Sequence, residues 1–260
     1  MKIATFNVNS IKARKELIIR WLNEKVSIDV LCFQELKCTD ENFPYEDFEN
    51  LGYKCEVFGQ KAYNGVAICS KFPFEEVQKG FGDEKMDREK RFIRAKINGI
   101  NILNIYAPHG EIEGVKHEYK LRFFEYLGNY IKNNFSLEKD MVCVAGDMNV
   151  ARDDIDVWEP ELLRGTIGFM DDEREAFEKF LSIGLVDLYR KFHPNSHGFT
   201  WWDYRNAAVW RDEGMRIDYI LASPPLSKLC KKIEVDMWTR RRRSPTPSDH
   251  APVIVHFETE

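Results

Sequence analysis

Acidic and amide side chains follow the ends of several short apolar segments in this sequence. Asn7 follows the apolar residues 3–6, and Glu35 follows residues 30–34. Acids or amides lie in the same way at Asp147 with Asn149, at Asp218 and at Asp249, which His250 follows. Tyr106 is a further polar residue at the end of an apolar segment. If these segments are strands of a central sheet, their polar side chains converge at one end of it, where loops give a substrate access.

The convergent groups suit a hard divalent cation and a phosphate. Carboxylate and amide oxygens are the ligands that Mg²⁺ or Mn²⁺ prefers. An amide among carboxylates limits their mutual repulsion and supplies a donor for a phosphate oxygen. A single histidine beside an acid suits the orientation of a phosphoryl group.

Each of these residues also has an ordinary structural explanation. Asp147 with Asn149 could close a strand as a turn, and Glu35 could cap a helix. Asp218 could form a surface ion pair with the neighbouring Arg216. It is the joint occurrence of all these positions at strand ends that favours a functional site.

The periodicity predicts strands with a few helices. We expect strands at residues 3–8, 28–34, 66–70, 92–97, 100–106, 141–145, 217–222 and 253–257. We expect helices at residues 11–25, 115–133 and 171–182, the first of them capped by Ser10. Asn98-Gly99 predicts a hairpin, so part of the pairing is antiparallel. An α/β sandwich in a single domain, residues 1–260, accounts for this pattern better than a parallel dinucleotide-binding fold, because G-x-G-x-x-G is absent.

Composition predicts a folded protein outside the membrane. Hydrophobic residues make up 43% of the chain, and the formal net charge is −5, which argues against a general nucleic-acid coat protein. No apolar run is long enough to span a bilayer, and residues 1–10 do not resemble a signal peptide. We therefore expect a cytoplasmic protein.

The six cysteines are scattered and form no C-x-x-C pair. Several lie inside apolar runs, so we expect buried free thiols, without a zinc site or a disulfide framework.

The run of arginines at 240–243 allows two interpretations. It could be a solvated surface segment, or it could form a rim that contacts phosphates. Charge alone does not distinguish them.

Five motifs, in this order, resemble those of the endonuclease/exonuclease/phosphatase superfamily: TFNVN at 5–9, FQELK at 33–37, GDMN at 146–149, MRIDY at 215–219 and SDHAP at 248–252. Further segments, at 59–67, 104–108, 172–175 and 199–205, resemble the exonuclease III branch of abasic-site endonucleases. The resemblance extends over essentially the whole chain.

The resemblance implies a four-layer α-β-β-α sandwich with two mixed, mainly antiparallel sheets flanked by helices. It implies a magnesium site, with manganese as the alternative ion, at Asn7, Glu35, Asp147, Asn149, Asp249 and His250. It implies catalytic roles for Tyr106, Asp147, Asn149, Asp218 and His250. It implies DNA contacts by Trp201, Arg205 and Arg216. Strand alternation separately predicts that one of Trp201 and Trp202 faces inward and the other outward.

The implied function is DNA repair, namely hydrolysis of the phosphodiester 5′ to an abasic site to leave a 3′-hydroxyl, with 3′–5′ exonuclease and 3′-phosphatase activity. The implied partner is double-stranded DNA with abasic sites or blocked 3′ ends, bound by a monomer. His109 departs from the family, which often has an amide there. Two alternatives stay open: a phosphatase or lipid phosphodiesterase of the same superfamily, and a non-catalytic DNA-binding protein with this fold.

Overall fold

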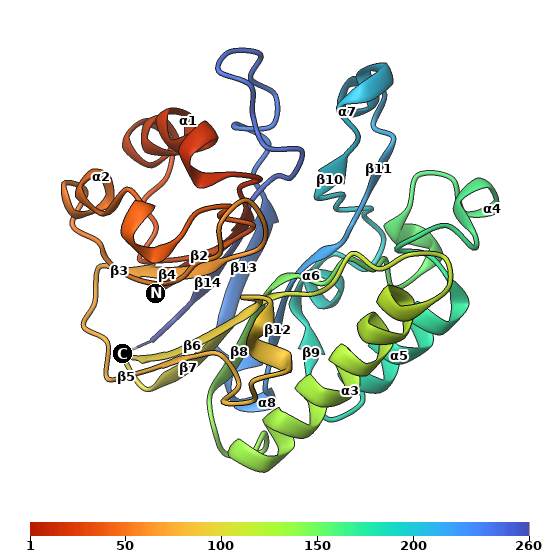
Figure 1. Ribbon diagram of the computed structural model, residues 1–260, viewed down its shortest axis with the longest axis horizontal. Helices are drawn as coiled ribbons and strands as arrows, with labels where there is room; N and C mark the ends of the chain where they lie inside the picture. Colours follow the sequence, from red (N-terminus) through yellow and green to blue (C-terminus); the bar gives the residue numbers. More distant parts are fainter. Residues whose placement is uncertain (260) are drawn as a thin grey trace.

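Strands with nearly continuous apolar sequence form the centre of the molecule, because they are covered on both faces. The computed structural model describes residues 1–259, with two six-stranded sheets face to face (Figure 1). The first sheet has the order β13 (Cys230–Val235), β14 (Val253–Phe257), β1 (Lys2–Asn7), β2 (Val30–Gln34), β4 (Val66–Ser70) and β3 (Lys54–Phe58). The second has the order β5 (Glu76–Lys79), β6 (Phe92–Ile97), β7 (Ile100–Tyr106), β8 (Val142–Asp147), β12 (Asp218–Ala222) and β9 (Val186–Asp187).

Both sheets are mixed and mainly antiparallel, as expected. Parallel pairing occurs between β1 and β2 and between β7 and β8, while the other strand pairs are antiparallel. A separate two-stranded sheet, β10 (Trp201–Trp202) with β11 (Gly214–Met215), extends from the end of the sandwich at which the polar residues gather.

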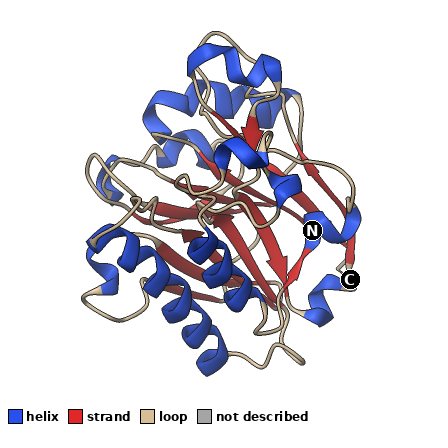
Figure 2. Ribbon diagram, turned by 90° about the vertical axis from the view of Figure 1, so that its right-hand side faces the viewer, coloured by secondary structure: helices blue, strands red, loops and turns tan. Residues whose placement is uncertain are grey.

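Helices cover the outer faces of the sandwich (Figures 1 and 2). α1 (Ile11–Glu24) and α2 (Tyr45–Glu49) lie on the first sheet, and α3 (Val115–Asn134) and α5 (Asp171–Leu181) lie on the second. Shorter helices lie in the connections: η1 (Asp40–Asn42), η2 (Met86–Arg88), η3 (Asp154–Asp156), α4 (Pro160–Leu163), α6 (Leu188–Phe192), η4 (Arg205–Ala207), α7 (Ala208–Arg211) and α8 (Pro224–Ser227).

Side-chain alternation along each strand divides the core into layers. On β8, Cys143 and Ala145 point into the space between the sheets, whereas Val142 and Val144 pack against the aromatic residues of α3 and α5. A third cluster fills the space between the first sheet and its helices. This four-layer arrangement confirms the predicted sandwich.

The strongest local signals of the sequence are confirmed. Asn98 and Gly99 have positive φ and connect β6 to β7, with Ile97 opposite Ile100. The Ser10 side chain accepts a hydrogen bond from the N–H of Ala13 at the start of α1.

The expectation of free thiols was wrong for one pair of cysteines. Cys55 and Cys69 form a disulfide between β3 and β4, where they lie directly opposite each other in an antiparallel register. Strand register brings these residues together, and the spacing of cysteines along the sequence does not reveal it. The cysteines at 32, 38, 143 and 230 are buried and free, as expected.

No helix within residues 1–259 has both the length and the apolar character required to cross a bilayer.

Gly146 lets β8 lie close to its neighbour β7. Its φ is 150°, and a Cβ atom there would lie 1.9 Å from the carbonyl oxygen of Ile105 on β7. Because Asp147 follows directly, the position of this carboxylate depends on a residue without a side chain.

We predict that Gly146→Ala lowers the free energy of unfolding by more than about 3 kcal/mol, because backbone of β7 has to move. The matched control is Gly165→Ala, where φ is +81° and nothing lies within 4 Å of an added Cβ. Conformational strain alone should make this control cost about 1–2 kcal/mol. Urea unfolding measures both, and equal losses would contradict the steric explanation.

Candidate active site

A hydrogen-bonded amide joins the two sheets at the end where the polar residues gather. Asn7 ends β1 in the first sheet, and its Nδ2 donates to Oδ2 of Asp147, which ends β8 in the second, over 2.9 Å. The same nitrogen donates to Oε2 of Glu35 over 3.0 Å. Asn7 is fully buried. One amide nitrogen therefore donates hydrogen bonds to two carboxylates that are far apart in the sequence.

Glu35 lies directly after β2, with backbone in the left-handed region at φ 55°. The N–H of Ser10 donates to its carbonyl oxygen over 2.9 Å, which helps to fix this conformation. Non-glycine residues rarely adopt positive φ, and such conformations are common where a side chain has to be aimed at a site. The Glu35 side chain is 20% exposed and has Nζ of Lys37 at 3.2 Å from Oε1.

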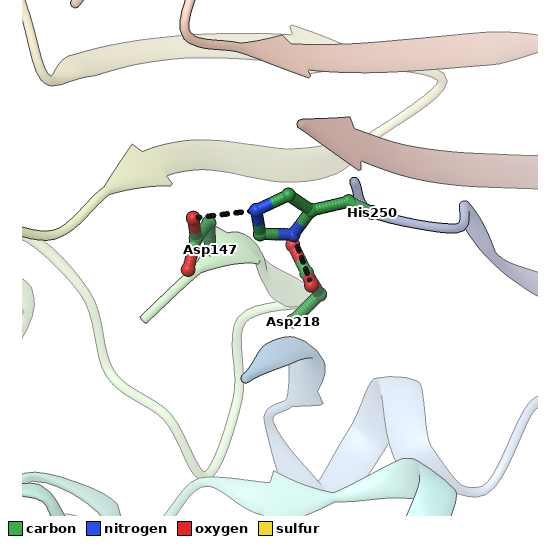
Figure 3. Close-up of side chains that lie close together, drawn as sticks. All are labelled: Asp147, Asp218 and His250. Carbon is green, nitrogen blue, oxygen red and sulfur yellow. Dashed lines mark hydrogen bonds and ion pairs between the residues drawn. The ribbon is translucent and has the colours of Figure 1, made fainter. Parts of the chain in front are cut away.

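Asp147, Asp218 and His250 form the centre of the site, as Figure 3 shows. Asp147 and Asp218 lie opposite each other on the antiparallel strands β8 and β12. His250 Nδ1 lies 2.8 Å from Oδ2 of Asp218, and Nε2 lies 3.7 Å from Oδ2 of Asp147. All three side chains are buried.

The carboxylates make this histidine a strong base. Burial alone lowers the pKa of His250, but the charge of Asp218, followed by that of Asp147, outweighs burial and raises the pKa to about 10. The imidazole is therefore protonated at neutral pH, and both ring nitrogens are donors.

The pKa of the Asp147 carboxyl lies close to neutral pH. Burial, followed by the charge of Asp218, raises its pKa to about 7, against the lowering effects of His250 and Asn7. A carboxyl with a pKa near the working pH is suited to accept a proton during a reaction.

Asn149 and Tyr106 border this centre. Asn149 has φ 52°, its N–H donates to Oδ1 of Asp147 over 2.9 Å, and its Nδ2 donates to the carbonyl of Ala107 over 2.8 Å. Tyr106 lies opposite Asp147 in the parallel register of β7 and β8. Burial, followed by the charges of Glu35 and Asp147, raises the pKa of Tyr106, so its hydroxyl is a donor at neutral pH.

Asp249 is held by two side-chain hydrogen bonds. Its Oδ1 accepts from Nδ2 of Asn9 over 3.2 Å, and its Oδ2 accepts from Nε1 of Trp201 over 3.0 Å. Asn9 also accepts from Lys37 over 2.8 Å, so one chain of contacts connects the Asp249 and Glu35 sides of the site.

A cavity of about 310 Å³ opens onto these groups. Its walls include most of the predicted catalytic and metal-binding residues, whereas Asn7 and Asp218 lie behind them and do not line it. The lining residues are Glu35, Tyr106, His109, Asp147, Asn149, Ile167, Gly168, Trp201, Met215, Ile217, Asp249 and His250. The structure thus brings the predicted residues of the strand ends to one place.

The residues expected to contact DNA are in different environments. Trp201 lines the cavity while Trp202 is only 2% exposed, so one of the pair faces outward as expected. Arg205 is exposed and paired with Asp203, which leaves it accessible.

The expected DNA contact of Arg216 is corrected by the structure. Its side chain is 0% exposed, with Nε 2.7 Å from Oδ1 of Asp156 and NH2 2.7 Å from Oδ2 of Asp187. This pairing fixes η3 to the start of α6 and leaves no guanidinium group for a phosphate.

The four arginines at 240–243 were expected to form either a solvated surface segment or a rim that contacts phosphates, and they do not all lie in the same environment. Arg240 is buried and donates to the carbonyl of Trp202 over 3.1 Å, so it supports the fold. The other three are exposed, and the Arg242 guanidinium lies 4.2 Å from the centre of the Trp238 ring.

Several residues that contribute to the site were not predicted. Thr200 accepts from the N–H of Asp218 through Oγ1 over 3.1 Å, and Ser248 donates to the carbonyl of Asn7 over 2.7 Å. A third is Lys120 on α3, which is 0% exposed and whose ammonium contacts the carbonyl of Asn149. The sequence does contain a signal for this position. Lys120 precedes Phe123, Phe124 and Leu127 by three, four and seven residues, which places it on the same helix face as these apolar side chains.

The oxygen-rich donor set fits a hard divalent cation. The ligand atoms of Asp147, Asp218 and His250 lie within 4.8 Å of one another and could hold an ion. Protonated His250, however, has no free lone pair. Glu35 is partly exposed to the cavity and already attracts the Lys37 ammonium, which marks its carboxylate as a place where positive charge is stabilised.

Comparison with known proteins agrees with this geometry. A profile described as "Endonuclease/Exonuclease/phosphatase family" matches residues 4–250. Exodeoxyribonuclease III of Haemophilus influenzae is 33% identical over 271 residues, which cover 99% of this chain and 100% of the relative.

Solved structures share the whole fold. An AP endonuclease from Archaeoglobus fulgidus is 42% identical with a TM-score of 0.94, and the match covers 100% of both chains. A Neisseria 3′ phosphatase bound to a product DNA hairpin is 35% identical with a TM-score of 0.93, again over 100% of both chains.

We predict that Asp218→Asn lowers the pKa of His250 from about 10 toward or below its ordinary value of 6.5, because the largest opposing charge is removed. Titration of the His250 ring by NMR measures this change. Asp203→Asn, at a partly exposed carboxylate paired with Arg205, is the control and should leave the titration unaltered. An unchanged His250 pKa in Asp218→Asn would show that another group sets its charge.

Proposed function

Because the chain belongs to the endonuclease/exonuclease/phosphatase family, we propose that it hydrolyses the phosphodiester backbone of damaged DNA, 5′ to abasic sites. The observation that carries this proposal is the buried group of Asp147, Asp218 and His250 at a cavity lined by Glu35 and Asn149. The AP endonuclease and exodeoxyribonuclease III similarities support a nuclease.

We assign the divalent cation to the Glu35 side of the cavity, with Mg²⁺ as the ion and Mn²⁺ as a substitute. Asn7 orients the Glu35 carboxylate, while Asp249, Asn149, Asp147 and His250 lie along the walls of the same cavity. When bound, such an ion supplies Lewis-acid stabilisation of the charge that develops on the phosphate. A role for His250 as a direct ligand requires its deprotonation.

Asp147 is the group suited to activate water. Its carboxyl is buried beside the cavity, its Oδ1 is fixed by the N–H of Asn149, and its pKa of about 7 allows it to accept a proton. A carboxylate in this position removes the proton from water as the water attacks phosphorus, without a covalent intermediate.

His250 and Asn149 suit the phosphate itself. Protonated His250, oriented through Nδ1 by Asp218, turns Nε2 toward the Asp147 side of the cavity. A fixed donor there stabilises negative charge on a phosphoryl oxygen more in the transition state than in the ground state. The Tyr106 hydroxyl is a second donor, because its raised pKa keeps it protonated.

The cavity supports a preference for a nucleotide without a base. Ile167, Trp201, Met215 and Ile217 provide apolar walls around a space of about 310 Å³. A base-free sugar loses no stacking when it leaves the duplex, so its extrusion costs less than that of an intact nucleotide. Trp201 and exposed Arg205 are proposed to contact the DNA.

A second activity, removal of 3′ blocking groups and 3′ nucleotides, is favoured by the likeness to the DNA-bound Neisseria 3′ phosphatase. The same phosphate-binding groups would serve at a strand end. The remaining expectations, a monomer that acts on cytoplasmic DNA and makes no use of a membrane, stay predictions.

We predict that the protein nicks a duplex containing a tetrahydrofuran abasic analogue in the presence of Mg²⁺, and that EDTA stops the reaction. A gel assay beside 3′-recessed and 3′-phosphate duplexes measures the three activities together. The control is an undamaged duplex with closed ends. An uncut analogue at enzyme excess would refute the assignment.

We predict that Asp147→Asn and Glu35→Ala each lower the nicking rate by at least about 100-fold, because proton transfer and metal binding are impaired. Glu178→Ala, at an exposed carboxylate on α5, should leave the rate unchanged. Circular dichroism verifies that the variants are folded. Unfolded variants would instead assign a structural role to both residues.

A further inference from the structure

A lysine lies in the core behind the candidate active site. On the inward face of α3, Phe123, Phe124 and Leu127 pack among apolar side chains, while Lys120 lies one turn earlier and is 0% exposed. Burying an ammonium group costs desolvation energy that an apolar side chain in its place would avoid. Stability alone therefore does not explain a lysine at this position.

The ammonium of Lys120 has three N–H donors and three acceptors around it. Nζ lies 2.7 Å from the carbonyl oxygen of Asn149, 3.0 Å from that of His109 and 2.6 Å from Oε1 of Glu173. Two of these acceptors belong to the loops that follow β7 and β8. Asn149 and His109 both line the cavity.

Glu173 extends the contact to a third loop. It is 0% exposed at the start of α5, and its Oε2 accepts from the N–H of Gly168 over 2.7 Å and from that of Met170 over 3.2 Å. Gly168 forms part of the cavity wall. One buried ion pair thus fixes the main chain of three cavity loops from behind.

The loop conformations make this support necessary. Asn149 has a φ of 52°, which a residue other than glycine keeps only when its surroundings determine it. At Gly110, beside His109, a Cβ atom would lie 2.9 Å from Cδ of Lys120, so the chain passes directly over the lysine stem. Because Gly110 has no side chain, the neighbouring carbonyl of His109 can approach the ammonium of Lys120.

We propose that Lys120 is a positioning residue of the phosphodiesterase reaction: its ammonium, whose charge Glu173 balances, fixes the main chain of Asn149 and His109 so that their side chains meet the reacting phosphate. The inference rests on the proposed function. Lys120 does not touch the substrate. Its effect belongs to the transition state, where a displacement of about 1 Å can cost about 100-fold in rate.

The test is single-turnover nicking of the tetrahydrofuran duplex by Lys120→Met/Glu173→Gln. This double variant removes both buried charges, keeps an oxygen for the N–H groups of Gly168 and Met170, and removes the donors to Asn149 and His109. We expect the rate at saturating DNA to fall at least tenfold, with less than a threefold change in the DNA dissociation constant. Glu173→Gln alone, which keeps the ammonium, should stay within about threefold of the wild type.

Lys132→Met, an exposed lysine on the same helix, controls for loss of a lysine and should change neither quantity. If the double variant does not fold, Lys120→Gln replaces it, since a shorter neutral donor cannot reach both carbonyls and should also slow the reaction. Thermal unfolding gives the folded fraction. An unchanged rate per folded molecule, or an equal loss in Glu173→Gln, would overturn the inference. Failure of the wild type to cut would instead refute the proposed function.

Discussion

The site depends on the burial of two like charges beside one imidazole. Asp147 and Asp218 lie opposite each other on neighbouring strands, and burial makes it costly for both to be ionised. His250 compensates for this cost because Asp218 and Asp147 raise its pKa to about 10 and keep it charged. The arrangement places a carboxyl with a pKa near neutrality beside a fixed donor, a combination that suits hydrolysis of a phosphodiester.

Much of the fold and the centre of the site could be predicted from sequence, because both depend on local pattern. Apolar runs ended by polar residues marked the strands, and Asn98-Gly99 fixed one pairing. When two sheets pack face to face, strand ends at the same edge of the sandwich lie close together. The sequence therefore predicts that Asn7 and Asp147 approach each other, and the hydrogen bond between them confirms it. The family resemblance then supplied the roles.

The remaining features depend on long-range contacts that no local pattern reveals. Arg216 resembled a DNA-contacting residue, but Asp156 and Asp187 approach it only in the folded chain. The pairing of Cys55 with Cys69 follows from strand register. In the sequence Lys120 is one charged residue of a helix among others, and its buried environment exists only because two loops and the start of α5 converge on it.

The position of the cation relative to His250 tests the account most directly. Anomalous diffraction at the manganese edge, from crystals grown with Mn²⁺ and a duplex containing an abasic analogue, would locate the ion. The account predicts a single strong peak at the carboxylate of Glu35, with Nε2 of His250 bonded to a phosphate oxygen. A peak ligated by His250 within the cluster of Asp147 and Asp218 would contradict it.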